Sequence, residues 1–290
     1  MKKIFFIFFI FIANCCIASD FDTIYENARK LLNENKNSEA LIFLKQAEII
    51  APENKKMFVF IDLGVCYRRL KNYDKSIQYY QMAAKISPKM TDIWYNIGLA
   101  YYYKRNFNDA IANYKKAIEL NPYYTESYGA MAMAYRDMGL IDIAIKTINK
   151  ALSIDSKYAG GYNILGNCYE DKGWHYKAIE MYNKAIALKT DYTSAYYNLG
   201  IVYDELGDYK KAIDYYEQAL VFDNKSADIY YNLGVSYMKS KNFMKAQETF
   251  KQVIKLDNSN KQAYNNLIEC LKSAGMEKEA IKWEEIKNSK

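Results

Sequence analysis

The chain has few of the residues that end short strands, and few of those that build metal or catalytic sites. Its 290 residues include 3 prolines, 12 glycines and one histidine, His175. Sandwiches and barrels of β-strands need frequent tight turns, so this scarcity argues against an all-β fold. A single histidine leaves almost no room for a multi-histidine metal site or a histidine-centred catalytic triad.

The net positive charge is also small. The 40 Lys and Arg residues exceed the 34 Asp and Glu residues by only 6, and five of the basic residues are arginine. A face that tracks phosphates needs more concentrated basic charge, so we expect no nucleic-acid partner. The hydrophobic fraction of 51% excludes a disordered chain. Tyrosine is in excess, with 30 residues, which indicates a repeated structural cause.

Residues 1–19 have the three parts of a secretory signal peptide. Lys2 and Lys3 precede an uninterrupted apolar run from Ile4 to Ala13, and a short stretch with small residues follows. The run is too short to cross a bilayer as a helix, which takes about 20 apolar residues. We therefore predict that the chain is exported, with retention of the segment as a membrane-lying anchor as the alternative.

Two processing routes remain open for this segment. The sequence Ile12-Ala13-Asn14-Cys15 resembles a bacterial lipobox, in which Cys15 would become the acylated first residue, although asparagine is unusual before that cysteine. Cleavage after Ala18 would release the chain without lipid. Lipidation of Cys15 is the favoured prediction, and the expected location is the periplasm, free or tethered as a lipoprotein. A lipid anchor would be the chain's only contact with a membrane.

Beyond the signal segment, the chain repeats one unit every 34 residues. The segment Trp94–Gly98 recurs as Tyr196–Gly200, 102 residues later, and as Tyr230–Gly234 after another 34 residues. When positions are numbered from Thr91, small residues recur at positions 8, 20 and 27, and tyrosine recurs at position 11. We predict that residues 21–290 form about seven 34-residue repeats and a truncated C-terminal capping repeat.

This pattern resembles the tetratricopeptide repeat, which has an aromatic residue at position 4, Leu-Gly at 7 and 8, Tyr at 11, Ala at 20 and 27, an aromatic residue at 24 and Pro at 32. The resemblance covers about 270 residues, although only Pro52, Pro88 and Pro122 fill position 32. It implies an all-α fold, a right-handed superhelical solenoid of stacked helix-turn-helix repeats. The spacing agrees, because positions 4, 7, 8 and 11 share one face of a first helix and positions 20, 24 and 27 share one face of a second.

In tetratricopeptide proteins the opposite face of the first helix lines a concave groove that holds extended peptides or partner helices, and the resemblance implies the same role here. Asparagine and tyrosine are frequent on this face, and an amide can pair with the main chain of an extended ligand. The candidate partner-binding residues are Tyr95, Asn96, Asn163, Asn167, Tyr197, Asn198, Tyr231, Asn232, Asn265 and Asn266. Alternatively, stacked amides bond only to one another across repeats. The row is interrupted by Gly129, Ala130 and Ile164, which favours two separate contact patches over one continuous strip.

Positions 12 and 13 on the same helix change sign along the chain. Three arginines come first and four carboxylates follow: Arg68, Arg69 and Arg136, then Glu170, Asp171, Asp204 and Glu205. Such a gradient either orients a charged partner or forms an ordinary solvated rim.

The cysteines of the repeats all occupy position 10. Cys66, Cys168 and Cys270 are successively three repeats apart, too far for disulfides, so we predict that they are buried thiols acting as small apolar residues.

No residue pattern supports catalysis, since we find no nucleophile elbow, no phosphate-binding glycine loop and no metal-ligand spacing. We predict no enzymatic activity, no cofactor and no metal. The expected function is a non-catalytic protein–protein interaction scaffold of the bacterial cell envelope. A self-associating structural solenoid and a polysaccharide-binding groove are the alternatives.

Overall fold

The computed structural model describes residues 20–289, and every regular element in that range is an α-helix. The predicted signal peptide and Cys15 lie outside the described residues. A helical segment covers residues 20–33. It is followed by α2 (Asn37–Ile50), α3 (Lys56–Arg69), α4 (Tyr73–Ile86), α5 (Thr91–Tyr103), α6 (Phe107–Leu120), α7 (Thr125–Asp137), α8 (Ile141–Ile154), α9 (Ala159–Asp171), α10 (His175–Leu188), α11 (Thr193–Glu205), α12 (Tyr209–Phe222), α13 (Ala227–Lys239), α14 (Phe243–Leu256), α15 (Lys261–Ser273) and α16 (Glu277–Asn288). None of the described helices is long and apolar enough to span a membrane.

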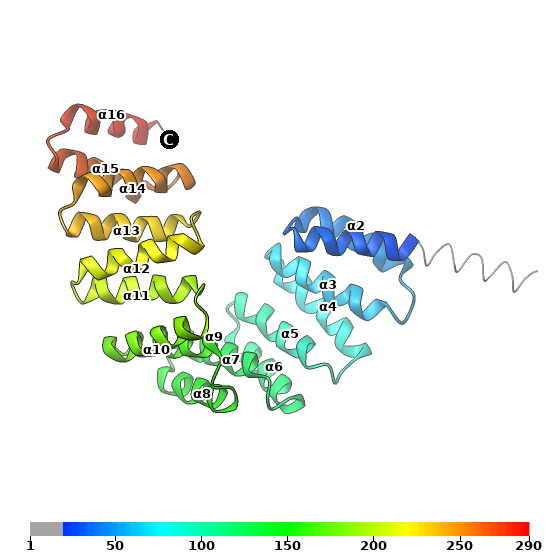
Figure 1. The fold of residues 1–290 in the computed structure, drawn as a ribbon. Coiled ribbons are helices and arrows are strands. Elements are labelled where there is room, and N and C mark those ends of the chain that lie inside the picture. Colours follow the sequence, from blue (N-terminus) through cyan, green and yellow to red (C-terminus); the bar gives the residue numbers. More distant parts are fainter. Residues whose placement is uncertain (1–19, 290) are drawn as a thin grey trace, which may run out of the picture. The chain divides into compact units, whose positions relative to one another are not determined.

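The chain forms two compact units, one ending at Thr147 and the other beginning at Ile148, so the boundary falls inside α8. In the first unit α5 packs against α6, α6 packs against α7, and α5 contacts α7. In the second unit each helix from α9 to α16 packs against the next (Figure 1). There the first helices of consecutive repeats are also neighbours, since α9 contacts α11, α11 contacts α13 and α13 contacts α15. The predicted all-α fold of stacked helix pairs is confirmed.

Small residues mark the closest approach of the two helices within a repeat. Ala110 at position 20 is fully buried, and so is Ala117 at position 27. The aromatic ring at position 24 lies directly on the glycine at position 8. A Cβ atom added to Gly234 would lie 2.8 Å from Cε1 of Phe250, and one added to Gly98 would lie 2.6 Å from Cε1 of Tyr114. This repeated ring accounts for part of the tyrosine excess.

The turn inside each repeat is built by two adjacent positions. Position 15 adopts a left-handed conformation, with φ between 70° and 78° at Gly139, Gly173, Gly207 and Gly275, and between 60° and 64° at Lys71, Arg105 and Lys241. Position 16 then caps the second helix. The side chains of Asn72, Asn106, Asp208 and Asn242 each accept a hydrogen bond from the backbone N–H three residues later.

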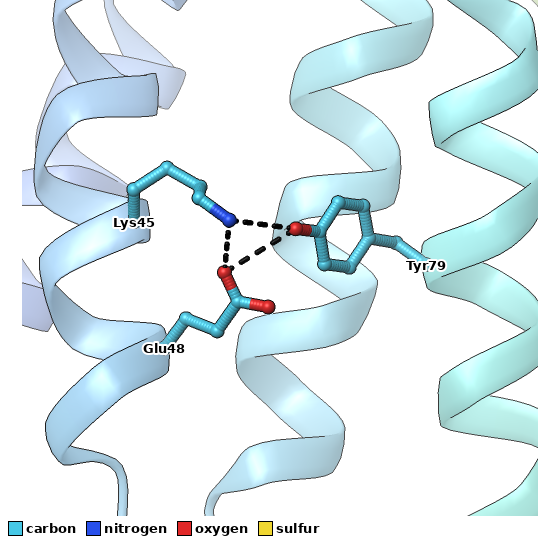
Figure 2. Close-up of polar contacts among 3 residues, drawn as sticks. All are labelled: Lys45, Glu48 and Tyr79. Carbon is cyan, nitrogen blue, oxygen red and sulfur yellow. Dashed lines mark hydrogen bonds and ion pairs between the residues drawn. The ribbon is translucent and has the colours of Figure 1, made fainter.

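A polar cluster joins α2 to α4 in the first unit (Figure 2). Lys45 Nζ donates to Tyr79 OH at 2.8 Å and pairs with Glu48, and Tyr79 OH lies 3.2 Å from Glu48 Oε2. The Tyr79 ring is buried and stacks on Tyr67 with 5.5 Å between ring centroids. Burial raises the pKa of Tyr79, and the hydrogen bonds to Glu48 and Tyr79 raise the pKa of Lys45.

The cysteines of the repeats are part of the core, as predicted. Cys66, Cys168 and Cys270 are fully buried, and no disulfide joins them. Burial raises the pKa of the Cys66 and Cys270 thiols to about 11, so neither forms a thiolate readily near neutral pH.

Candidate functional site

The candidate groove residues are divided between the two units. Tyr95 and Asn96 lie on α5 in the first unit, and the other eight lie on α9, α11, α13 and α15 in the second. Asn96 Nδ2 donates to the backbone oxygen of Asp92 at 2.8 Å, a bond within its own helix. Tyr95 packs edge-on against Tyr124 and tilted against Tyr114, with ring centroids 5.5 and 5.9 Å apart. In the first unit, therefore, these two residues mainly support the local packing.

In the second unit the amide at position 6 bonds to the side chain at position 5 of the preceding repeat, 35 residues earlier. Asn198 Nδ2 donates to Asn163 Oδ1 at 3.1 Å. Asn232 Nδ2 donates to Tyr197 OH at 2.8 Å, and Asn266 Nδ2 donates to Tyr231 OH at 3.2 Å. We call Asn163, Asn167, Tyr197, Asn198, Tyr231, Asn232 and Asn266 the amide ladder. The same inter-repeat bond therefore recurs three times along the first helices.

One tyrosine from a second helix, Tyr182, extends this network. Asn198 also donates to Asn167 Oδ1 at 2.9 Å, and the hydroxyl of Tyr182 on α10 lies 2.8 Å from the same oxygen. That hydroxyl is also 2.6 Å from Glu170 Oε2. The ring at position 24 thus passes beside the first helix and places its polar tip at positions 9 and 12. Sequence analysis missed this contact because it assigned position 24 only to the core.

These bonds leave hydrogen-bonding capacity on the amide ladder. Within residues 20–289 no group donates to Oδ1 of Asn198, Asn232 or Asn266, and all three side chains are half-buried. Asn163 is only 8% exposed, and its Oδ1 accepts from Asn198, whereas its Nδ2 has no acceptor in that range. The amides therefore do bond across repeats, and they also keep one carbonyl oxygen per repeat for another donor.

Asn265 lies apart from the ladder. It is exposed, and its Oδ1 accepts from Lys287 Nζ of α16 at 3.2 Å. It lines a shallow pocket of about 350 Å³ on the last helix pair, in which Lys272 pairs with Glu284 at 2.8 Å. The pocket is lined by two lysines and two carboxylates, so its lining carries no net formal charge.

Charged residues at positions 12 and 13 make contacts between helices. Arg69 Nη1 donates to the backbone oxygen of Leu32 at 2.6 Å, near the end of the first helical segment. Asp204 Oδ2 accepts from Ser236 Oγ at 2.8 Å and from Tyr216 OH at 3.3 Å. Burial raises the pKa of Asp204 above the ordinary carboxyl value. These residues therefore stabilise the stacking, whatever they contribute to a partner.

The first unit has an apolar pocket of about 40 Å³. Its lining comes from α5, α6 and α7: Leu99, Tyr102, Tyr103, Tyr114, Ala130 and Met133. Tyr114 is fully buried, and its hydroxyl has no hydrogen-bond partner among the described residues. Burial, and then the neighbouring tyrosines, raise its pKa. Sequence analysis missed this pocket as well. We identify no group of three metal-ligating side chains in the described range.

Several solved structures have the same fold. A chain of the APC/C hetero-tetramer Cut9–Hcn1 has a TM-score of 0.69 and 18% identity, covering 84% of this chain and 48% of that one. A tetratricopeptide repeat protein of Parabacteroides merdae has a TM-score of 0.66 and 16% identity, covering 87% and 99%. The pilF protein of Pseudomonas aeruginosa has a TM-score of 0.60 and 19% identity, covering 67% and 88%. This chain thus spans about half the length of the Cut9–Hcn1 chain, and identities this low show the fold alone.

Sequence comparison defines the family. No curated protein matches the chain significantly. Family models described as tetratricopeptide repeat match residues 59–90, 91–124, 125–158, 162–224 and 227–260. These ranges contain most of the described helices. The repeat spacing, the stacked helix pairs and these matches agree, and the chain belongs to the tetratricopeptide repeat family.

Proposed function

We propose that this chain is a non-catalytic scaffold that holds an extended segment of another protein along the first helices of its second unit. Tetratricopeptide repeat proteins typically bind other proteins. The observation that carries the proposal is the set of carbonyl oxygens on Asn198, Asn232 and Asn266, one per repeat and each without a donor among residues 20–289.

The spacing of these oxygens suits the main chain of an extended peptide. Packed helices lie about 8–10 Å apart, and an extended chain in the polyproline II conformation has three residues per turn and rises about 3.1 Å per residue, so three residues span roughly 9 Å. Every third main-chain N–H of such a peptide points the same way and can therefore meet the next amide oxygen. Because these bonds go to the backbone, they tolerate many side chains on the partner.

The test uses displayed random peptides of roughly 12 residues, which in extended form span about four repeats. Peptides selected on the wild-type chain are then measured by fluorescence anisotropy against the double variant Asn198→Ala with Asn232→Ala. At about 1 kcal/mol for each lost hydrogen bond, the double variant should bind roughly 30-fold more weakly.

The matched control is Asn149→Ala with Asn183→Ala, which removes two exposed asparagines from the second helices α8 and α10. This variant should bind like the wild type. Urea unfolding of both variants separates lost binding from lost stability, since Asn198 and Asn232 also bond between repeats. Equal peptide affinity of the ladder variant and the control variant would refute a role for the amides in binding.

We propose further that the scaffold works in the bacterial cell envelope, exported through residues 1–19 and anchored by lipid on Cys15. The support is the order of Lys2 and Lys3, the apolar run Ile4–Ala13 and the cysteine that follows it. Expressed in a Gram-negative bacterium, the mature chain should begin at an acylated Cys15 by intact-mass spectrometry, and Cys15→Ala should abolish the lipid mass. A mature chain that begins at Ser19 would contradict lipidation, and an intact Met1 would contradict export.

A further inference from the structure

We propose that the apolar pocket of the first unit binds a methionine side chain of a partner segment. This inference rests on the proposed function, because it assumes that the chain binds extended segments of other proteins. It adds a side-chain preference, located in the first unit, to the backbone recognition proposed for the second.

The pocket is formed between two neighbouring first helices. Leu99, Tyr102 and Tyr103 come from α5, and Ala130 and Met133 come from α7, which contacts α5. These residues occupy positions 6, 9, 12 and 13, the face that lines the groove in this family. Ala130 stands at the position that carries asparagine in three of the four later repeats, and its small side chain leaves the space open.

The walls of the pocket are held in place by contacts outside it. Tyr102 OH donates to Asp137 Oδ2 at 2.7 Å, and the Tyr103 ring stacks on Tyr73 with 6.0 Å between ring centroids. Tyr103 and Met133 are 48% and 40% exposed, so the pocket is rimmed by side chains that a ligand can touch. The volume of about 40 Å³ suits the end of one slim side chain and is too small for an aromatic ring.

Tyr114 supplies a second, independent feature. In the second unit the tyrosine at the same repeat position reaches polar groups at positions 9 and 12, as Tyr182 does with Asn167 and Tyr216 does with Asp204. In the first unit these positions are Leu99 and Tyr102, and the fully buried Tyr114 hydroxyl has no partner in the described range. A buried hydroxyl in a folded protein normally has a partner, so the site favours a ligand that brings an acceptor.

Methionine meets these requirements together. Its side chain is unbranched and apolar, so it fits a narrow pocket whose lining carries no charge. Its sulfur is a weak hydrogen-bond acceptor, and it can pair with the buried Tyr114 hydroxyl once a small shift of the lining exposes that atom to the pocket. Thioethers also pack favourably against aromatic rings, of which Tyr102, Tyr103 and Tyr114 supply three. A charged side chain would lose its hydration there without gaining a partner.

The experiment uses pools of extended peptides in which one position at a time is fixed as methionine, norleucine or alanine. Norleucine has the length of methionine but lacks its sulfur. On the wild-type chain, one position should prefer methionine over alanine by roughly tenfold or more, and over norleucine by roughly threefold.

Two variants then locate the preference. Ala130→Leu fills the pocket and should remove the preference for methionine while leaving the alanine pools unchanged. Its control is Ala112→Leu, at an exposed site on α6, which should keep the preference. Tyr114→Phe removes the hydroxyl but keeps the ring, so it should reduce the preference for methionine over norleucine without abolishing it, while both still exceed alanine; an unchanged preference would refute the role of the hydroxyl.

The outcomes separate this inference from the proposed function. If no pool binds, the proposed function fails and the inference falls with it. If the pools bind but methionine does not exceed alanine, or if Ala130→Leu keeps the preference, the pocket assignment alone is overturned. Equal binding of methionine and norleucine to the wild type would refute the choice of methionine.

Discussion

Replacing Gly234 with alanine adds one methyl group at the closest approach of α13 and α14. The new Cβ atom would lie 2.8, 2.9 and 3.0 Å from Cε1, Cζ and Cδ1 of Phe250. The Phe250 ring is fully buried and packs edge-on against Tyr231 with 5.9 Å between ring centroids. Since contacts this short are not tolerated and the ring is buried, the two helices must separate or the ring must shift from its position.

Two opposing terms determine the net effect. Alanine is favoured over glycine inside a helix by about 0.5–1 kcal/mol. Overpacking a core by one methyl group costs about 1–3 kcal/mol. We therefore expect Gly234→Ala to lower the free energy of unfolding by roughly 1–2 kcal/mol.

The assay is urea unfolding followed by circular dichroism, with amide hydrogen exchange of α13 and α14 to show that the loss is local. A double-mutant cycle with Phe250→Ile isolates the contact. The repeat of residues 125–158 supplies the precedent in sequence, because it has Ala132 and Ile148 at the same two positions. Removing the ring should relieve the clash, so the double variant should be less destabilised than the sum of the single variants by about 1–2 kcal/mol.

A gain in stability for Gly234→Ala would refute this reasoning, since it would mean that helix propensity outweighs the contact with the ring. Additive effects in the cycle would refute it too, because the methyl group and the ring would then act independently.

Three further predictions concern single side chains. Lys241→Gly should raise the free energy of unfolding by about 0.5–1 kcal/mol in urea titrations, because the lysine has a φ of 63° that glycine adopts without strain; a loss would contradict this. Burial raises the folded-state pKa of Asp204, so its contribution to stability falls as pH rises from the ordinary carboxyl pKa through the raised value. As the pH rises from about 3 to about 7, the free energy of unfolding of Asp204→Asn should therefore increase relative to that of the wild type. A difference that does not change with pH would refute this. Tyr79→Phe removes a hydroxyl bonded to Lys45 and Glu48 and should lower the unfolding free energy by about 1 kcal/mol in thermal unfolding, whereas an unchanged value would show that these bonds are neutral.

The fold was predictable because each repeat carries its own helix signals. Positions 8, 20 and 27 are small in nearly every block, and Gly98 with Ala110 and Ala117 is one example. These residues specify two helices that can approach closely, and the unpaired faces require a neighbouring repeat. The confirmed helix pairs therefore follow from patterns within 34 residues of sequence.

The candidate site was only partly predictable. The row of asparagines at position 6 is visible in the sequence, but their donation to Asn163, Tyr197 and Tyr231 depends on the neighbouring repeat. The hydrogen bonds of the Tyr182 hydroxyl to Asn167 and Glu170 could have been predicted by comparing position 24 with positions 9 and 12. Those positions are polar in the repeat of residues 159–192, with Asn167 and Glu170. In the repeat of residues 91–124 they are Leu99 and Tyr102, and the Tyr114 hydroxyl has no partner in the described range.

The sequence alone determined the repeat length, the helix pairs, the close contacts at small residues and the scarcity of groups for catalysis. These features arise from residues near one another along the chain, where spacing and side-chain size are enough to predict them. The tertiary structure decided which polar side-chain groups form hydrogen bonds, as the amide of Asn198 does, and which have no partner among the described residues, as with the hydroxyl of Tyr114. Such contacts join residues 12 to 35 positions apart, and they depend on how one helix is stacked beside the next.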